Sequence, residues 1–153
     1  MKRYLILFII LGFSKPSIGQ NSHNEQLIKS VVLAFQDDFN EGGFKNAEFY
    51  TTKEWIHINP GGGITKGRNA VLKEVRTVHQ TFLKGVSLII ESITIRFLTS
   101  NVAIANVVHK SSDYELPQGI IHQNERQRKT YILVKKQNKW FLTLDQNTVI
   151  AGK

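Results

Sequence analysis

Four segments in the second half of the chain have the composition of long β-strands, and they limit the possible folds more than any other feature. β-branched and aromatic residues are frequent in all four segments. The polar links Thr99-Ser100-Asn101 and Lys136-Gln137-Asn138 separate them into two pairs, as β-hairpin turns do. The segments are residues 87–97, 102–110, 130–135 and 139–144. We therefore predict two long hairpins, with polar residues 111–125 forming an extended loop or irregular hairpin between them.

Helical periodicity dominates the first half of the chain. An apolar stripe follows Ser22, and the spacing of Ser22 and Glu25 is typical of a capping box, so we predict a helix from Ser22 to about residue 40. Residues 44–50 suit a short second helix. Residues 67–84 predict a third helix with Val78 in its apolar stripe and His79 on its flank.

A short strand is predicted at residues 54–59, between the second and third helices. Its alternation puts Trp55 and His57 on one face and Ile56 and Ile58 on the other. Helices therefore come first and most strands last, an order that indicates an α+β fold with helices packed on one curved sheet. A chain of 153 residues is long enough for one such domain.

The N-terminus has the features of a secretory signal peptide. Lys2 and Arg3 precede an apolar run at residues 4–13, and small residues follow at Ser17-Ile18-Gly19. We predict a signal peptide at residues 1–19 and a mature domain at 20–153. The protein is then periplasmic or secreted, without membrane association once the peptide is removed.

Composition argues against several functions. The net charge of +8 falls to +5 without Lys2, Arg3 and Lys15, and the remaining basic residues are dispersed, so nucleic-acid binding is not expected. The absence of cysteine excludes disulfides and thiolate chemistry. The five histidines show no metal-ligand spacing, and residues 60–63 do not complete a nucleotide motif. We expect neither a metal nor a cofactor.

Several stretches resemble one protein group. They are KGRNAV at residues 66–71, KGVSL at 84–88, IRFLTSNVAIANVV at 95–108, and Trp140 with Gln146-Asn147-Thr148. On these the chain is identified as a member of the SgcJ/EcaC-type group of SnoaL-like, ketosteroid-isomerase-like domains, within the nuclear-transport-factor-2-like superfamily. The resemblance implies a cone-shaped, curved antiparallel or mixed sheet wrapped against about three N-terminal helices, with one pocket, commonly in a homodimer.

The chain departs from that group at two places. Val75 stands where the third helix often carries a histidine, and Gly43-Phe44 stands where an acidic residue is common. The superfamily contains isomerases, dehydratases, cyclases and binding domains, so its fold does not decide whether this chain is an enzyme.

Proton-transfer chemistry requires a base and hydrogen-bond donors. Asp145 is the candidate carboxylate, and His57 and His109 are alternative bases. Strict alternation puts Asp145 on one face with Phe141 and Asn147. A simpler alternative is that Asp145 only pairs with Arg128 or Lys129. The candidate ligand-binding residues are Trp55, His109, Arg128, Tyr131, Phe141 and Asn147, and the candidate catalytic residues are Asp145 and His57.

Two functional hypotheses follow. The first is an exported domain that binds a small, largely apolar molecule in its pocket and possesses, in its enzymatic version, a cofactor-independent proton-transfer activity. The alternative is a non-catalytic dimeric interaction or assembly module, which predicts an apolar exposed sheet surface.

Overall fold

The computed structural model of the protein describes residues 18–151. Residues 1–17 of the predicted signal peptide therefore lie outside the described residues. Helix α1 spans Ile18–Glu41, so the predicted start at Ser22 is wrong. Because the helix already continues through Ser22, this residue has no helix terminus to cap. The predicted apolar stripe is confirmed, since Ile28, Val32 and Phe35 are buried.

Two further helices follow α1, as predicted. Helix α2 is a single turn at Ala47–Tyr50, and helix α3 spans Arg68–Gln80. The buried residues of α3 include His79, whereas Val78 is only partly buried, so their predicted positions are reversed. His79 is tolerated in the core because its Nδ1 lies 2.8 Å from the carbonyl oxygen of Val75 and its Nε2 lies 3.0 Å from that of Phe39.

Six strands form one curved mixed sheet in the order β2-β1-β8-β7-β4-β3. Strands β1 and β8 pair in parallel, and the other neighbours pair antiparallel. The bounds are β1 Thr51–Ile58, β2 Ile64–Lys66, β3 Leu88–Thr99, β4 Val102–Ser111, β7 Arg126–Lys136 and β8 Lys139–Val149. The predicted closing turn is confirmed, and Gln137 and Asn138 both have positive φ, as the tight turn of a hairpin requires.

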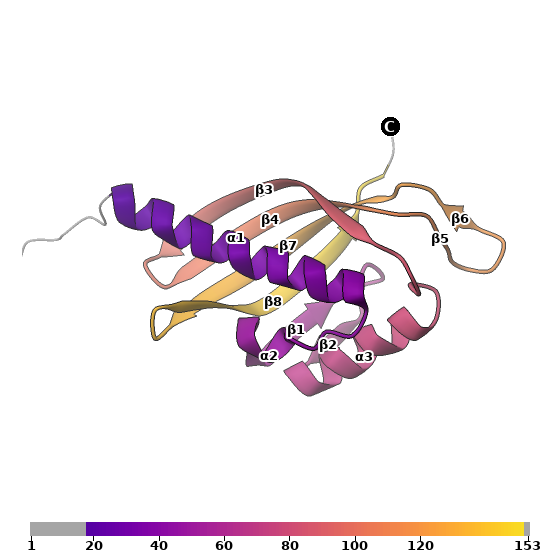
Figure 1. Cartoon of the computed structure of the whole chain (residues 1–153), viewed down its shortest axis with the longest axis horizontal. Coiled ribbons are helices and arrows are strands. Elements are labelled where there is room, and N and C mark those ends of the chain that lie inside the picture. Colours follow the sequence, from indigo (N-terminus) through magenta and orange to yellow (C-terminus); the bar gives the residue numbers. More distant parts are fainter. Residues whose placement is uncertain (1–17, 152–153) are drawn as a thin grey trace, which may run out of the picture.

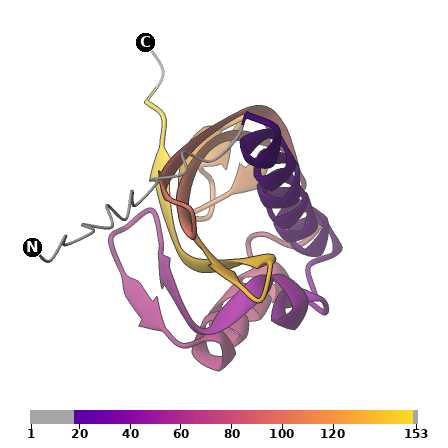
Figure 2. The same ribbon diagram turned by 90° about the vertical axis from the view of Figure 1, so that its left-hand side faces the viewer.

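The sheet curls around α1, which crosses its concave side, while α3 lies beside β1 and β2 (Figures 1 and 2). Phe35 of α1 packs edge-on against Tyr131 of β7 and Trp55 of β1, which joins the helix to two strands. The predicted α+β cone is therefore confirmed, and the concave side carries the core.

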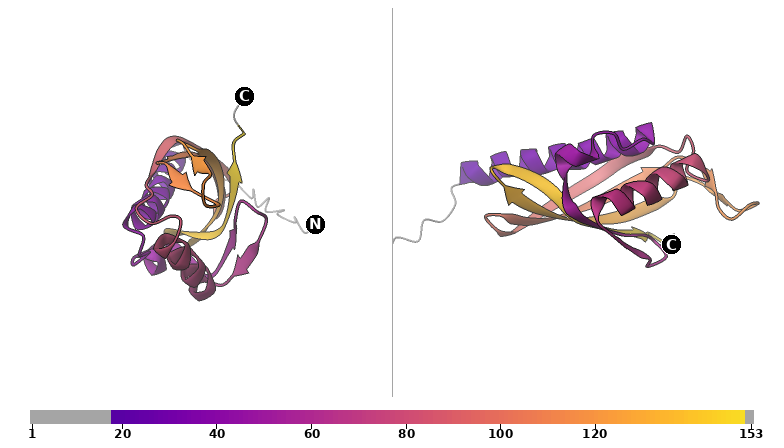
Figure 3. Two further views of the ribbon diagram at one scale, coloured as in Figure 1. Left: turned by 90° about the vertical axis from the view of Figure 1, so that its right-hand side faces the viewer. Right: turned by 90° about the horizontal axis from the view of Figure 1, so that it is seen from below.

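The polar segment before β7 forms a small hairpin of β5 (Tyr114–Glu115) and β6 (Ile121–His122). It projects from one end of the main sheet (Figures 1 and 3). Tyr114 and His122 stack at 4.6 Å within it. Among residues 18–151, no helix has both the length and the apolar character needed to cross a membrane.

Candidate functional site

A buried carboxylate, Asp145, organises the polar groups on the concave side of the sheet. Its side chain has no exposed surface. Trp55 Nε1 donates to Oδ1 at 2.6 Å, while His57 Nδ1 lies 2.8 Å and Lys129 Nζ 3.0 Å from Oδ2. A carboxylate can be buried at modest cost only with such partners.

The strand register brings these side chains together. The parallel pairing of β1 with β8 sets His57 beside Asp145, and Trp55, two residues earlier, shares the face of His57. The antiparallel pairing of β7 with β8 sets Tyr131 opposite Asp145 and Lys129 opposite Asn147. Four expected site residues, Trp55, His57, Tyr131 and Asp145, are thus neighbours.

A β-bulge in β8 corrects the prediction for Phe141. The pairing with β7 slips between Ile132 and Leu133, and the buried residues of β8 change from Trp140 and Leu142 to Asp145. One extra residue therefore lies between Leu142 and Asp145, which breaks strict alternation. Phe141 consequently lies on the outer face, opposite to Asp145.

Arg128 also lies outside the expected site. On β7 the buried residues are Lys129, Tyr131 and Leu133, so exposed Arg128 points to the other face. The charge partner of Asp145 is Lys129, one of the two basic residues named in the simpler alternative. Lys129 was not expected in the site itself because it lies in a basic run typical of solvated strand edges. Its alternation with Tyr131 and Leu133 was the signal that placed it inside.

The Lys129 ammonium group is itself enclosed. Its side chain is 7% exposed, and Nζ lies 4.3 Å from the centre of the Phe35 ring, within cation–π range. Burial alone would raise the pKa of Asp145, but the charge of Lys129 and the hydrogen bond from His57 lower it to about 2. The carboxylate is therefore ionised at neutral pH.

His57 connects this buried carboxylate to the solvent. Its side chain is 10% exposed, and Nδ1 must carry a proton to donate to Asp145. Within residues 18–151, Nε2 has no hydrogen-bond partner and retains contact with solvent. In neutral His57 this nitrogen bears a lone pair, so it can accept a proton while Asp145 orients the ring.

The remaining candidates lie further along the concave face. His109 is buried on β4, with Nε2 3.1 Å from the Tyr131 hydroxyl oxygen. Burial and the charge of Lys129 lower the pKa of His109 to about 3, so it is neutral and unsuited to act as a base at neutral pH. Asn147 donates from Nδ2 to Gln127 Oε1 at 2.6 Å.

Two cavities open elsewhere on the surface. One of about 500 Å³ lies at the start of α3, beside Lys53 and Lys66, and one of about 330 Å³ lies between the segment 122–126 and the end of β8. Neither is lined by Asp145 or His57. Among residues 18–151, no three His, Cys, Asp or Glu side chains gather as a metal site requires.

Solved structures share the fold of this chain. An uncharacterised Caulobacter vibrioides protein with a cystatin-like fold is 18% identical, with a TM-score of 0.78 over 84% of this chain and 91% of its own. A provisionally named scytalone dehydratase from Novosphingobium aromaticivorans is 14% identical, with a TM-score of 0.73 over 88% of this chain and 89% of its own. An NTF2-like protein of the same organism is 12% identical, with a TM-score of 0.72 over 88% of this chain and 86% of its own.

The chain has the cystatin-like fold of NTF2-like proteins. No protein-family model matches the sequence, and no curated protein matches it either. The likeness therefore lies in the NTF2-like fold, and membership of the SgcJ/EcaC group stays a prediction.

Proposed function

We propose that this NTF2-like chain is an exported, SnoaL-like protein of the SgcJ/EcaC type that binds a small, uncharged, largely apolar molecule beside His57 and moves a proton on it without a cofactor. The observation that carries the proposal is the His57–Asp145 pair, in which one ring nitrogen is fixed by a buried carboxylate and the other is free. Such a pair meets the requirements of a general base.

The charges of the site support an uncharged ligand. Asp145 and Lys129 neutralise each other across 3.0 Å. A charged ligand that enters this buried site would lose its hydration without finding an unpaired opposite charge. The aromatic rings of Phe35, Trp55 and Tyr131 suit an apolar skeleton.

The proposed reaction begins with transfer of a proton from an acidic carbon of the ligand to Nε2 of His57. The resulting imidazolium is stabilised by Asp145, whose second oxygen is held by Trp55. Return of the proton to another carbon gives isomerisation, and its transfer to a departing hydroxyl group releases water. The dehydratase name carried by one structural neighbour is compatible with the second outcome.

Isomerisation of 3-cyclohexen-1-one to its conjugated isomer, followed by ultraviolet absorbance, tests proton transfer directly. We expect the purified protein to accelerate it, and His57→Gln and Asp145→Asn to reduce the rate on the order of 100-fold. Gln146→Ala, exposed and adjacent to Asp145, is the matched control and should retain the rate. No acceleration, or equal rates in His57→Gln and the wild type, would refute the catalytic proposal.

A specific surface favours the alternative, a homodimeric assembly module. Ile104, Ile132, Leu144 and Ile56 lie in register across β4, β7, β8 and β1, on the face opposite to Asp145. All four are partly exposed, so they form an apolar row on the outside of the sheet. A second copy rotated by a two-fold axis would cover the row with an identical one.

Light scattering after size-exclusion chromatography tests this assembly. A dimer that Ile132→Asp converts to a monomer, while the exposed control Gln146→Ala does not, would support it. A wild-type monomer at all concentrations would exclude it.

A further inference from the structure

We propose that His109 supplies a buried N–H donor that recognises an oxygen acceptor on the ligand, so that the ligand is a carbonyl or hydroxyl compound and not a hydrocarbon. This inference rests on the proposed function, because the proposed function places the ligand beside His57, on the concave face of the cone. It adds a specificity-determining residue that is separate from the His57–Asp145 pair.

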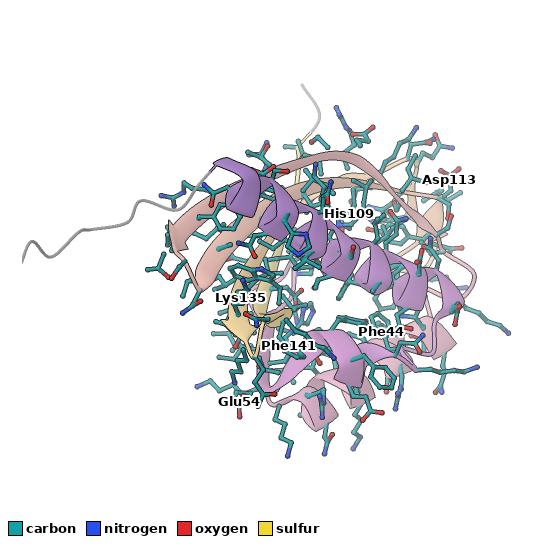
Figure 4. The ribbon with its side chains drawn as sticks, turned by 60° about the vertical axis from the view of Figure 1, so that its left-hand side comes forward. Phe44, Glu54, His109, Asp113, Lys135 and Phe141 are labelled. Atoms are coloured by element: carbon teal, nitrogen blue, oxygen red, sulfur yellow. The ribbon has the colours of Figure 1, made fainter. Side chains whose placement is uncertain are left out.

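The position of His109 is the first support. It belongs to the buried face of β4, where it follows Ala103, Ala105 and Val107 in alternation. His109 is only 1% exposed, and Figure 4 labels it among the side chains drawn around helix α1. The small alanines on this face leave the larger polar side chain of His109 as an interruption in an apolar surface.

The hydrogen bonds of the ring give the second support. Nε2 faces the Tyr131 hydroxyl, while Nδ1 is buried and has no partner among residues 18–151. If Nε2 carried the proton, both the Nδ1 lone pair and the Tyr131 hydroxyl hydrogen would lack partners. If Tyr131 donates to Nε2, only the Nδ1–H group remains unsatisfied. The second arrangement is favoured because it leaves fewer buried polar groups without a partner.

The protonation states agree with that geometry. Burial, with the charge of Lys129, lowers the pKa of His109 to about 3, so the ring is neutral. Burial and the nearby Asp145 carboxylate raise the pKa of Tyr131 well above its ordinary value, so its hydroxyl group keeps the hydrogen that it donates.

An unsatisfied buried N–H group destabilises the folded protein, so a native protein that retains one requires an explanation. A ligand oxygen would provide the missing acceptor. Hydrogen bonding to an oxygen of a neutral carbonyl or hydroxyl group also fits a site whose Asp145 and Lys129 charges already cancel.

The tautomer can be measured without any ligand. Nitrogen-15 chemical shifts of the His109 ring should show a neutral ring protonated at Nδ1, and Tyr131→Phe should shift the equilibrium towards the Nε2–H form. A ring protonated at Nε2 in the wild type, or doubly protonated at pH 7, would overturn the inference.

Ligand selectivity is tested with cyclohexanone and methylenecyclohexane, two rings that differ by an oxygen in place of a CH₂ group. We expect His109→Leu to weaken cyclohexanone binding roughly tenfold while changing methylenecyclohexane binding less than about threefold. His109→Gln, which retains N–H donors, should recover part of the loss. The matched control is Asn106→Ala, on the opposite face of β4.

The outcomes separate the two proposals. If both probes bind and His109→Leu changes them equally, the ligand site stands and the role of His109 is refuted. If neither probe binds the wild type, both the proposed function and this inference fail. Tyr131→Phe gives a second variant if His109→Leu does not fold. It should also weaken the binding of cyclohexanone more than the binding of methylenecyclohexane.

Discussion

Two buried carboxylates, Asp38 and Asp145, satisfy their oxygens in opposite ways. Asp38 on α1 is 1% exposed and, within the described part of the chain, accepts only from uncharged donors: the Tyr50 hydroxyl at 2.8 Å, and the Asn46 backbone and side-chain N–H groups at 3.1 Å. These residues lie within 12 positions of Asp38 in the chain. Asp145 instead accepts from Trp55, His57 and Lys129, two of which can carry charge.

The difference separates a structural carboxylate from a candidate functional one. The partners of Asp38 close the connection between α1 and α2 and leave no titratable nitrogen free. The partners of Asp145 come from separate strands, and His57 keeps Nε2 available. Burial by itself therefore does not identify a site; the identity of the hydrogen-bond donors does.

The largest expected loss of stability follows from removing Asp145, the charge partner of Lys129. Asp145→Ala should lower the free energy of unfolding by about 3–5 kcal/mol, because it leaves a buried ammonium group unpaired. Urea denaturation at pH 7 measures it. Adding Lys129→Met to Asp145→Ala should restore part of the loss, and an unaltered loss in the double variant would show that the charge pair is not the cause.

A smaller loss is expected at Asp38. Asp38→Ala should cost about 2–3 kcal/mol, since the Tyr50 hydroxyl and Asn46 N–H groups lose their acceptor without leaving a buried charge. Urea denaturation again provides the measurement, and Tyr50→Phe should cost about 1 kcal/mol. A loss as large as that of Asp145→Ala would remove the proposed distinction between the two carboxylates.

Acid should affect the Asp145 site selectively. Its pKa is about 2 in the folded protein against an ordinary 3.8, so its contribution of roughly 2 kcal/mol is complete above pH 4 and is lost as the pH falls towards 2. Unfolding free energies measured between pH 2 and 5 should therefore fall more steeply in the wild type than in Asp145→Asn. Parallel curves would contradict this assignment.

The smallest effect is expected for the stability of the β5–β6 hairpin, which should decrease as the pH rises. The backbone carbonyl of Leu116 and the carboxylate of Glu125 both accept from His122 and raise its pKa. The hydrogen bonds of protonated His122 therefore stabilise the hairpin fully below the ordinary histidine pKa of about 6.5. This stabilisation weakens as the pH rises through the raised pKa of His122.

Hydrogen exchange of residues 113–124, corrected for intrinsic rates, measures the opening of that hairpin. We expect protection to decrease with rising pH in the wild type and to be low and pH-independent in His122→Ala. A pH response that survives in His122→Ala would show that His122 is not its source.

Local chemistry made the α+β fold predictable. The polar turn at residues 136–138, the apolar stripe of α1 and the alternation in the long strands depend on neighbouring residues, and the structure confirms them. The start of α1 was missed because a good capping sequence at Ser22 does not end the helix that precedes it.

The candidate site was only partly predictable. Alternation placed Trp55 and His57 on one face, but no local signal announced the parallel pairing that brings them to Asp145. Phe141 and Arg128 were misplaced and Lys129 underweighted, because a single bulge and the direction of one strand face decide which side chains enter the core.

The sequence by itself determined the helices, the strands and the residue types available for proton chemistry, since these depend on local propensity and periodicity. Only the tertiary structure decided which of those residues meet. The reason is physical: the partners of Asp145 lie 16 to 90 positions away in the chain, and sheet register and curvature alone bring them within hydrogen-bond distance.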